Sequence, residues 1–124
     1  MGLLRPFFTK YQKNPMRSQL DTITNWPALA KEAGYRPKKL AKRAGVCLRQ
    51  LERWVRLKKN MTPREFCTLL RLTEAAAELP TSHKSMKELA AAYAYTQATN
   101  FSRDFRKFYG VTPRGYQDRL RASP

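Results

Sequence analysis

One stretch of this chain occurs twice, fifty residues apart, and this repeat constrains the fold more than any other feature. When residues 51–71 are laid over residues 101–121, seven of the twenty-one positions are identical, and four of the seven are arginines. The identical pairs are Arg53/Arg103, Arg56/Arg106, Thr62/Thr112, Pro63/Pro113, Arg64/Arg114, Leu70/Leu120 and Arg71/Arg121. A self-match at a fixed offset is typical of a duplicated supersecondary unit.

Both copies of the repeat have the periodicity of an amphipathic helix. In the first copy, Leu48, Leu51 and Val55 form an apolar stripe, and charged residues fill the opposite side. In the second copy we expect Phe101, Phe105 and Phe108 to point inward. A short helical pattern precedes each copy, at residues 40–46 and 89–95. The repeated unit is therefore predicted to be a helix, a tight turn and a second helix, followed by a Thr-Pro start of the next helix.

Helix-start and helix-stop signals divide the rest of the chain. Thr62 with Glu65, and Ser85 with Glu88, have the spacing of a capping box, and Pro80 ends the long helix that Thr62 begins. These signals predict an all-α fold of about seven helices, with two helix-turn-helix lobes joined by a central linker helix. The expected segments are a basic and aromatic arm at 1–24, a first lobe at 25–61, the linker helix at 62–80 and a second lobe at 81–124.

The charge of the chain points to a polyanionic partner. Its 124 residues carry a net charge of +16, and Lys and Arg that meet phosphates release condensed counterions. A ribosomal or merely solubilising surface is the alternative. The acidic residues are scattered and the single His lies in a polar loop, so we expect neither an enzyme nor a cofactor or metal site. Two cysteines twenty residues apart suggest reduced thiols in a cytoplasm. No apolar run reaches the length of a membrane span.

The second copy of the repeat carries a distinctive motif, Asn-Phe-Ser-Arg-Asp-Phe-Arg-Lys-Phe-Tyr-Gly-Val-Thr-Pro at residues 100–113, with Tyr116 after it. Leu40-Ala41, Ala44-Gly45-Val46 and Leu51-Glu52-Arg53 precede Thr62-Pro63-Arg64-Glu65-Phe66 and the central helix in the first copy. With these motifs, residues 36–121 resemble the DNA-binding domain of the AraC/XylS family of bacterial transcription regulators. The resemblance implies seven helices in two lobes, each placing its second helix in the major groove. In this respect it is similar to the small stand-alone members, which lack an effector domain and bind as monomers.

Two residues depart from the family pattern. Ala94 stands where the second turn usually carries Gly, and if this position needs a positive φ, Ala costs roughly 1 kcal/mol there. Cys47 stands where the first recognition helix commonly has a Ser cap. Both departures bear on how tightly each lobe docks.

The side chains that match base edges are Arg for guanine and Asn or Gln for adenine. On this basis the expected base-contacting residues are Arg49, Glu52, Arg53, Gln97, Thr99, Asn100 and Arg103. Arg53 and Arg103 hold equivalent positions in the two copies, which strengthens both assignments; a solvated helix face or an internal salt bridge, as between Arg103 and Asp104 or Glu88, is the structural alternative. Basic residues near helix starts are expected to contact phosphates. They are Arg36, Lys38, Lys39, Arg64, Arg106, Lys107 and Arg114.

These patterns together predict a sequence-specific regulator that binds double-stranded DNA in the bacterial cytoplasm, at the nucleoid. A basic structural, RNA-binding or chromatin-packing protein without sequence specificity is the first alternative. A module that contacts RNA polymerase and binds DNA only weakly is the second.

Overall fold

The computed structural model describes residues 18–122. Within that range the chain forms a short 3₁₀ helix and seven α-helices, with no strand. The elements are η1 (Gln19–Thr22), α2 (Trp26–Glu32), α3 (Pro37–Arg43), α4 (Leu48–Lys59), α5 (Pro63–Glu78), α6 (Met86–Ala92), α7 (Ala98–Tyr109) and α8 (Pro113–Ala122). The all-α fold class is confirmed. Most of the basic and aromatic arm expected at the N-terminus lies outside the described residues.

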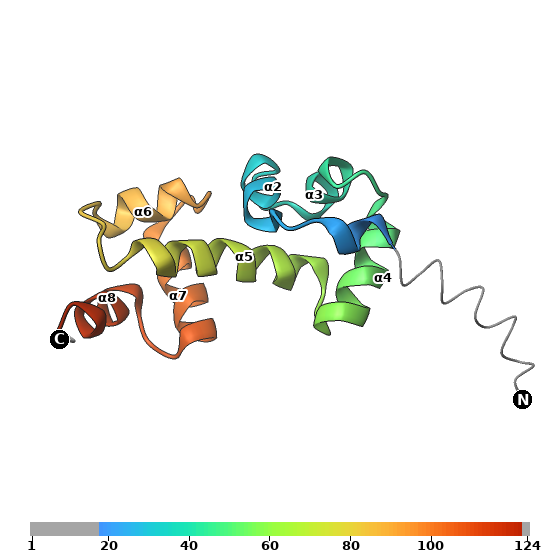
Figure 1. Cartoon of the computed structure of the whole chain (residues 1–124). Helices are drawn as coiled ribbons and strands as arrows, with labels where there is room; N and C mark the ends of the chain where they lie inside the picture. The colour runs from blue at the N-terminus through green and yellow to red at the C-terminus, as the bar shows by residue number, and fades with distance from the viewer. Residues whose placement is uncertain (1–17, 123–124) are drawn as a thin grey trace, which may run out of the picture.

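Helix α5 runs through the middle of the molecule, with a group of helices at each end (Figure 1). We call η1 and α2–α4 the first lobe, and α6–α8 the second lobe. Helices α2, α3 and α4 pack on α5 from the first lobe, and α7 packs on it from the second. The helix predicted from its Thr-Pro start and its Pro80 stop is thus the element on which both lobes rest.

Three helices end in the same kind of turn. In each, a backbone N–H reaches back to the carbonyl five residues earlier: Tyr35 to Ala30 at 2.8 Å, Val46 to Ala41 at 3.0 Å and Tyr95 to Ala90 at 2.9 Å. These Schellman motifs need a left-handed residue just before the donor. That residue is Gly34 (φ +65°) after α2, Gly45 (φ +81°) after α3 and Ala94 (φ +66°) after α6. The condition under which Ala94 is costly, a positive φ at this position, is therefore met.

The two capping boxes form as predicted. Thr62 Oγ1 accepts a 3.1 Å bond from the N–H of Glu65, and Glu65 Oε1 accepts a 2.9 Å bond from the N–H of Thr62. Ser85 and Glu88 make the same reciprocal pair at 3.0 and 2.8 Å. At the start of α4, Gln50 Oε1 accepts from the N–H of Cys47 at 3.0 Å, so a Gln side chain supplies the bond there.

Aromatic side chains form the centre of each lobe. In the first lobe Trp26 stacks on Trp54 at 5.1 Å, and Phe66 meets both rings edge-on. In the second lobe Phe105 contacts Phe101, Tyr109 and Tyr116, with ring centroids 4.6–5.9 Å apart. Such pairs add to the free energy of burial because their quadrupoles are complementary. The helical spacing of the aromatic rows predicts that they are core. Phe66, Phe101 and Phe105 are buried, and Trp54 and Tyr116 are partly buried against them, whereas Phe108 is not part of the core.

Two expectations about which side chains are buried are wrong. Phe108 is 41% exposed, although its spacing from Phe101 and Phe105 places it on the same side of α7, because it borders a cleft that is open to solvent. The helical period of α5 predicts one apolar face, made of Phe66, Leu69, Leu70, Thr73, Ala76 and Ala77. In the structure Leu72 and Ala75 are also buried, whereas Thr73 and Ala77 are exposed. Because both lobes pack on α5, this helix is buried on more than one side. A single apolar stripe therefore does not predict its buried residues.

Candidate nucleic-acid interface

The two candidate recognition helices, α4 and α7, are fixed in rotation by their inner faces. Leu51 and Val55 of α4, and Phe101 and Phe105 of α7, are all 0% exposed. A helix whose inner face is fully packed cannot turn about its axis without opening cavities, which cost several kcal/mol. The residues on the outer faces are therefore held toward solvent.

The expected base-contacting residues lie on these outer faces. Arg49, Glu52 and Arg53 are exposed on α4. Within residues 18–122 their side chains make no hydrogen bond or ion pair, so the side-chain donors and acceptors are available to a ligand. Around the start of α7, Gln97 and Thr99 are exposed and share a weak 3.4 Å hydrogen bond, and Asn100 is half-buried.

Arg103 is not held by the acidic residue beside it. Its guanidinium Nε lies 3.9 Å from Asp104, and the side chain is 72% exposed, so the pair is a weak surface contact. Asp104 instead accepts a 2.9 Å hydrogen bond from the Tyr95 hydroxyl. The alternative role for Arg103, an internal salt bridge with Asp104, is therefore too weak to hold its side chain away from DNA.

The expected phosphate-contacting residues are all exposed, and three of them line one cleft between the lobes. Arg36 comes from the start of α3, Arg64 from the start of α5 and Lys107 from α7, and Arg103 borders the same cleft. Two carboxylates, of Glu65 and Asp104, also line it. Because residues from both lobes converge here, we call it the inter-lobe cleft.

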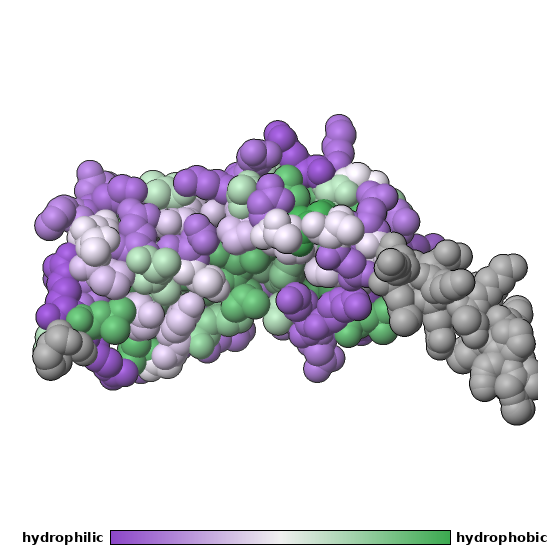
Figure 2. Space-filling model, in the orientation of Figure 1, coloured by the Kyte–Doolittle hydropathy of each residue, from purple (hydrophilic) through white to green (hydrophobic). Residues whose placement is uncertain are grey.

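The remaining phosphate candidates lie near the cleft or at helix starts. Lys39 lines a neighbouring hollow with Arg36, and Arg106 lines another with Arg103 and Lys107. Lys38 and Arg114 sit in the first turns of α3 and α8. Figure 2 shows hydrophilic side chains spread over both lobes, including a group that projects from the first lobe near the end of α4.

The repeated arginines do not all share one role. Arg71 Nη1 donates to the carbonyl of Tyr93 at 3.3 Å. Its counterpart Arg121 donates to the carbonyls of Pro80 at 3.1 Å and Ser82 at 2.7 Å. Arg71 and Arg121 therefore each bind backbone carbonyls just after the end of a helix, whereas Arg53 and Arg103 face solvent. All four arginines are identical between the repeats, so the sequence does not distinguish them. The packing shows that one pair is structural and the other is exposed.

Helix η1 supports the first recognition helix, and no pattern in the sequence predicts it. Asp21 accepts a 2.8 Å hydrogen bond from Trp54 Nε1 and lies 3.6 Å from Lys58 Nζ, both on α4. The Trp54 bond, followed by the Lys58 charge, lowers the pKa of Asp21. Gln19 Nε2 also donates to the carbonyls of Ala44 and Gly45, each at 3.1 Å, at the turn into α4. Four residues are too few to show a periodicity that would have revealed this element.

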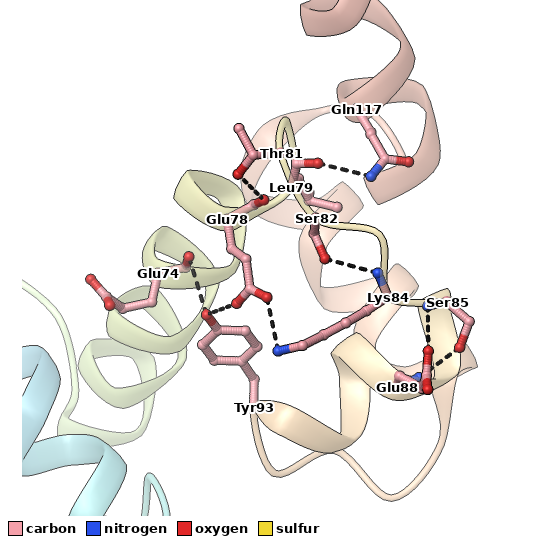
Figure 3. A network of polar contacts seen from close by, with 10 residues as sticks. All are labelled: Glu74, Glu78, Leu79, Thr81, Ser82, Lys84, Ser85, Glu88, Tyr93 and Gln117. Atoms are coloured by element: carbon pink, nitrogen blue, oxygen red, sulfur yellow. Dashed lines mark hydrogen bonds and ion pairs between the residues drawn. The ribbon is translucent and has the colours of Figure 1, made fainter.

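A polar network joins the end of α5 to the second lobe (Figure 3). Glu78 binds Tyr93 of the α6 turn at 2.7 Å and Lys84 at 2.9 Å. The buried Gln117 of α8 donates to the carbonyl of Leu79 at 2.8 Å. The site that positions α7 therefore includes polar residues outside the recognition helix, and none of these pairings shows in the sequence spacing.

Known proteins share both the sequence pattern and this arrangement. A family model described as a helix-turn-helix domain matches residues 40–119. Over 75 residues the chain is 35% identical to the transcriptional activator RhaS of Pectobacterium carotovorum subsp. carotovorum (strain PC1). It is 33% identical over 75 residues to the transcriptional regulator ArgR of Pseudomonas aeruginosa. Each match covers 60% of this chain, but only 27% of RhaS and 23% of ArgR, so the chain spans about a quarter of these curated relatives.

Solved structures give the same result. A transcriptional regulator from Chromobacterium violaceum with an AraC-type DNA-binding domain superposes with a TM-score of 0.70 at 26% identity, covering 80% of this chain and 90% of that one. The DNA-binding domain of AdpA, solved in complex with a target DNA, superposes with a TM-score of 0.66 at 26% identity, covering 78% and 90%.

Two helix-turn-helix lobes on one linker helix define a DNA-binding domain of a transcription regulator. The chain belongs to the AraC/XylS family, as the matched family model and these relatives show. Proteins of this class are DNA-binding transcription regulators. No helix in the described part of the chain is both long and apolar enough to cross a bilayer.

Proposed function

We propose that this chain regulates transcription by binding double-stranded DNA at a specific sequence, with α4 and α7 inserted in successive major grooves. The observation that carries the proposal is the equivalent placement of Arg53 and Arg103. Each is exposed on the outer face of a helix whose inner face is fully buried. An Arg fork presented in this way matches the O6 and N7 acceptors of guanine.

The linker helix sets the scale of the site. Its sixteen residues, at 1.5 Å each, make a rod of roughly 24 Å. The recognition helices pack on this rod from the two lobes, and successive major grooves on one face of DNA are about 34 Å apart. We therefore propose that one chain, bound as a monomer, contacts two DNA segments about one helical turn apart.

We place the DNA backbone that joins these two segments against the inter-lobe cleft. Arg36, Arg64 and Lys107 come from both lobes and from the linker, and phosphate contacts of this kind fix register without reading sequence. The charge of +16 favours the same partner. Such a regulator acts where the bacterial chromosome lies, so we place it in the cytoplasm, at the nucleoid.

Selection of bound duplexes from a random pool tests the proposal. We expect one enriched sequence with two short conserved segments about one turn apart, and a log affinity that falls with log salt by about 0.9 per phosphate contacted. Scrambled DNA of the same length is the control. Equal affinity for enriched and scrambled duplexes at moderate salt would favour the non-specific basic protein instead.

A further inference from the structure

Arg71, near the middle of α5, lies between one tyrosine ring from each lobe. Its guanidinium carbon is 4.2 Å from the ring centroid of Tyr95 and 5.1 Å from that of Tyr35. Tyr35 follows α2 in the first lobe, and Tyr95 follows α6 in the second. Both tyrosines are buried, with 4% and 8% of their surfaces exposed. One side chain of the linker thus contacts both lobes at once.

The two tyrosines occupy corresponding positions in two copies of the same turn. Each follows directly after the left-handed residue of a Schellman motif, Gly34 in one case and Ala94 in the other. The backbone differs at the tyrosines themselves, because Tyr35 is also left-handed (φ +59°) and Tyr95 is not. Arg71 also donates to the carbonyl of Tyr93, so it binds both the ring and the backbone of the α6 turn.

The contact continues into the second recognition helix. The Tyr95 hydroxyl donates to Asp104 on α7, directly beside Arg103. The Tyr95 ring also packs on Phe101 with centroids 5.5 Å apart. A shift of Tyr95 relative to Arg71 therefore changes the position of α7 relative to α5 and the first lobe.

The energetics of this arrangement favour a role in orientation over one in stability alone. Contacts between a cation and a ring contribute about 0.5–2 kcal/mol each. Against this, Arg71 Nε and the Tyr35 hydroxyl are both buried with no hydrogen-bond partner among the described residues. Buried unpaired donors are costly, and an apolar side chain of similar length avoids that cost. A rigid planar guanidinium held close to two rings does, however, restrict their positions more than a flexible aliphatic chain does.

We propose that Arg71, held between Tyr35 and Tyr95, contributes to fixing the orientation of the two lobes, alongside the packing of both lobes on α5, and so to setting the spacing of the two DNA segments that the protein binds jointly. The orientation claim concerns the protein alone, and the spacing claim rests on the proposed function. Arg71 acts here as a positioning residue, through the lobes that it joins.

The first experiment is done without DNA and compares the full chain with its Arg71→Met variant. Residual dipolar couplings report the orientation of each lobe in one alignment frame. In the wild type both lobes should fit one alignment tensor, and in Arg71→Met each lobe should keep its own structure but need a separate tensor. Arg121→Met is the matched control, because Arg121 binds carbonyls at the end of α5 and in the loop before α6 and makes no contact with the first lobe. It should keep the single tensor.

One tensor for Arg71→Met, with the orientation of the wild type, would overturn the proposal. If Arg71→Met does not fold, Tyr35→Leu removes one ring while leaving the arginine, and the same comparison applies. Arg71→Lys keeps the charge but loses the planar group, and it should also need two tensors.

The second experiment measures binding to duplexes in which the two segments are one turn apart or are shifted by about five base pairs, half a turn. The wild type should prefer the first duplex, and Arg71→Met should lose roughly tenfold of that preference while binding each isolated segment as the wild type does. An unchanged preference would overturn the spacing role. If the wild type binds no paired site, the proposed function fails, and the dipolar couplings still decide the orientation claim.

Discussion

The Tyr93 hydroxyl donates a 2.7 Å hydrogen bond to Glu78 Oε1, which fastens the turn after α6 to the last turn of α5 (Figure 3). Lys84 Nζ lies 2.9 Å from the other carboxylate oxygen of Glu78. The Lys84 contact is the larger cause and the Tyr93 bond the second, and together they hold the pKa of Glu78 below its ordinary value of 4.5. The second lobe is thus attached to the linker by an ionised carboxylate.

The Glu78 attachment predicts an acid-sensitive contribution to stability. A carboxylate whose pKa is lower in the folded state contributes fully above its unfolded pKa, and this contribution is lost as the pH falls through the folded value. Glu78→Gln should therefore lower the free energy of unfolding at pH 7 and flatten its decline below about pH 4.5. Urea denaturation from pH 7 to pH 2.5 measures both effects. Glu52→Gln, which removes an exposed carboxylate on α4, is the control, and curves parallel to the wild type for Glu78→Gln would contradict the prediction.

Ala94 offers a stabilising substitution. Its φ of +66° places a Cβ where L-residues are strained, and glycine adopts this region freely. Ala94→Gly should raise the free energy of unfolding by about 1 kcal/mol, with a corresponding rise in Tm. Ala91→Gly, at an exposed position inside α6, should lower it by a similar amount because there the helix favours alanine. Thermal denaturation of both variants shows whether each substitution raises or lowers the stability. A destabilised Ala94→Gly variant would show that the backbone strain is absent.

The two cysteines should differ in reactivity. Cys67 is 1% exposed on α5, and burial raises the pKa of its thiol to about 11, whereas Cys47 is exposed at the start of α4. Because the thiolate is the reactive form, a maleimide at pH 8 should label one thiol in the folded chain and two in denaturant. Mass spectrometry counts the labels. Cys47→Ser should abolish the fast reaction, and equal rates at both sites would mean that α5 opens readily.

Arg53 and Arg103 should contribute to specificity, and Lys39 to affinity alone. Arg53→Ala and Arg103→Ala should each cost about 1–3 kcal/mol on the selected duplex and little on random DNA. Lys39→Ala should weaken both kinds of binding about equally, because a phosphate contact carries no sequence information. Competition binding with both duplexes makes the comparison. Lower Tm with unchanged selectivity in the arginine variants would assign these residues a structural role.

Local chemistry allowed most of the fold to be predicted from the sequence. The capping boxes at Thr62 and Ser85 and the apolar stripe on α4 each involve residues within one or two helical turns of one another. The repeat added the pairing of the two lobes, and with it the equivalence of Arg53 and Arg103. Those two residues are exposed as expected, since an outer face is determined once the inner face is known.

Contacts between distant residues were decided only by the tertiary structure. Asp21 meets Trp54, Gln117 meets the carbonyl of Leu79, and Arg71 lies between Tyr35 and Tyr95, each across more than twenty residues of chain. Arg71 and Arg53 are equally marked by the repeat, yet one binds the lobes together and the other faces solvent. A sequence period records which side of its own helix a residue occupies. What lies opposite that side depends on how the helices pack, and here two lobes pack on different parts of α5.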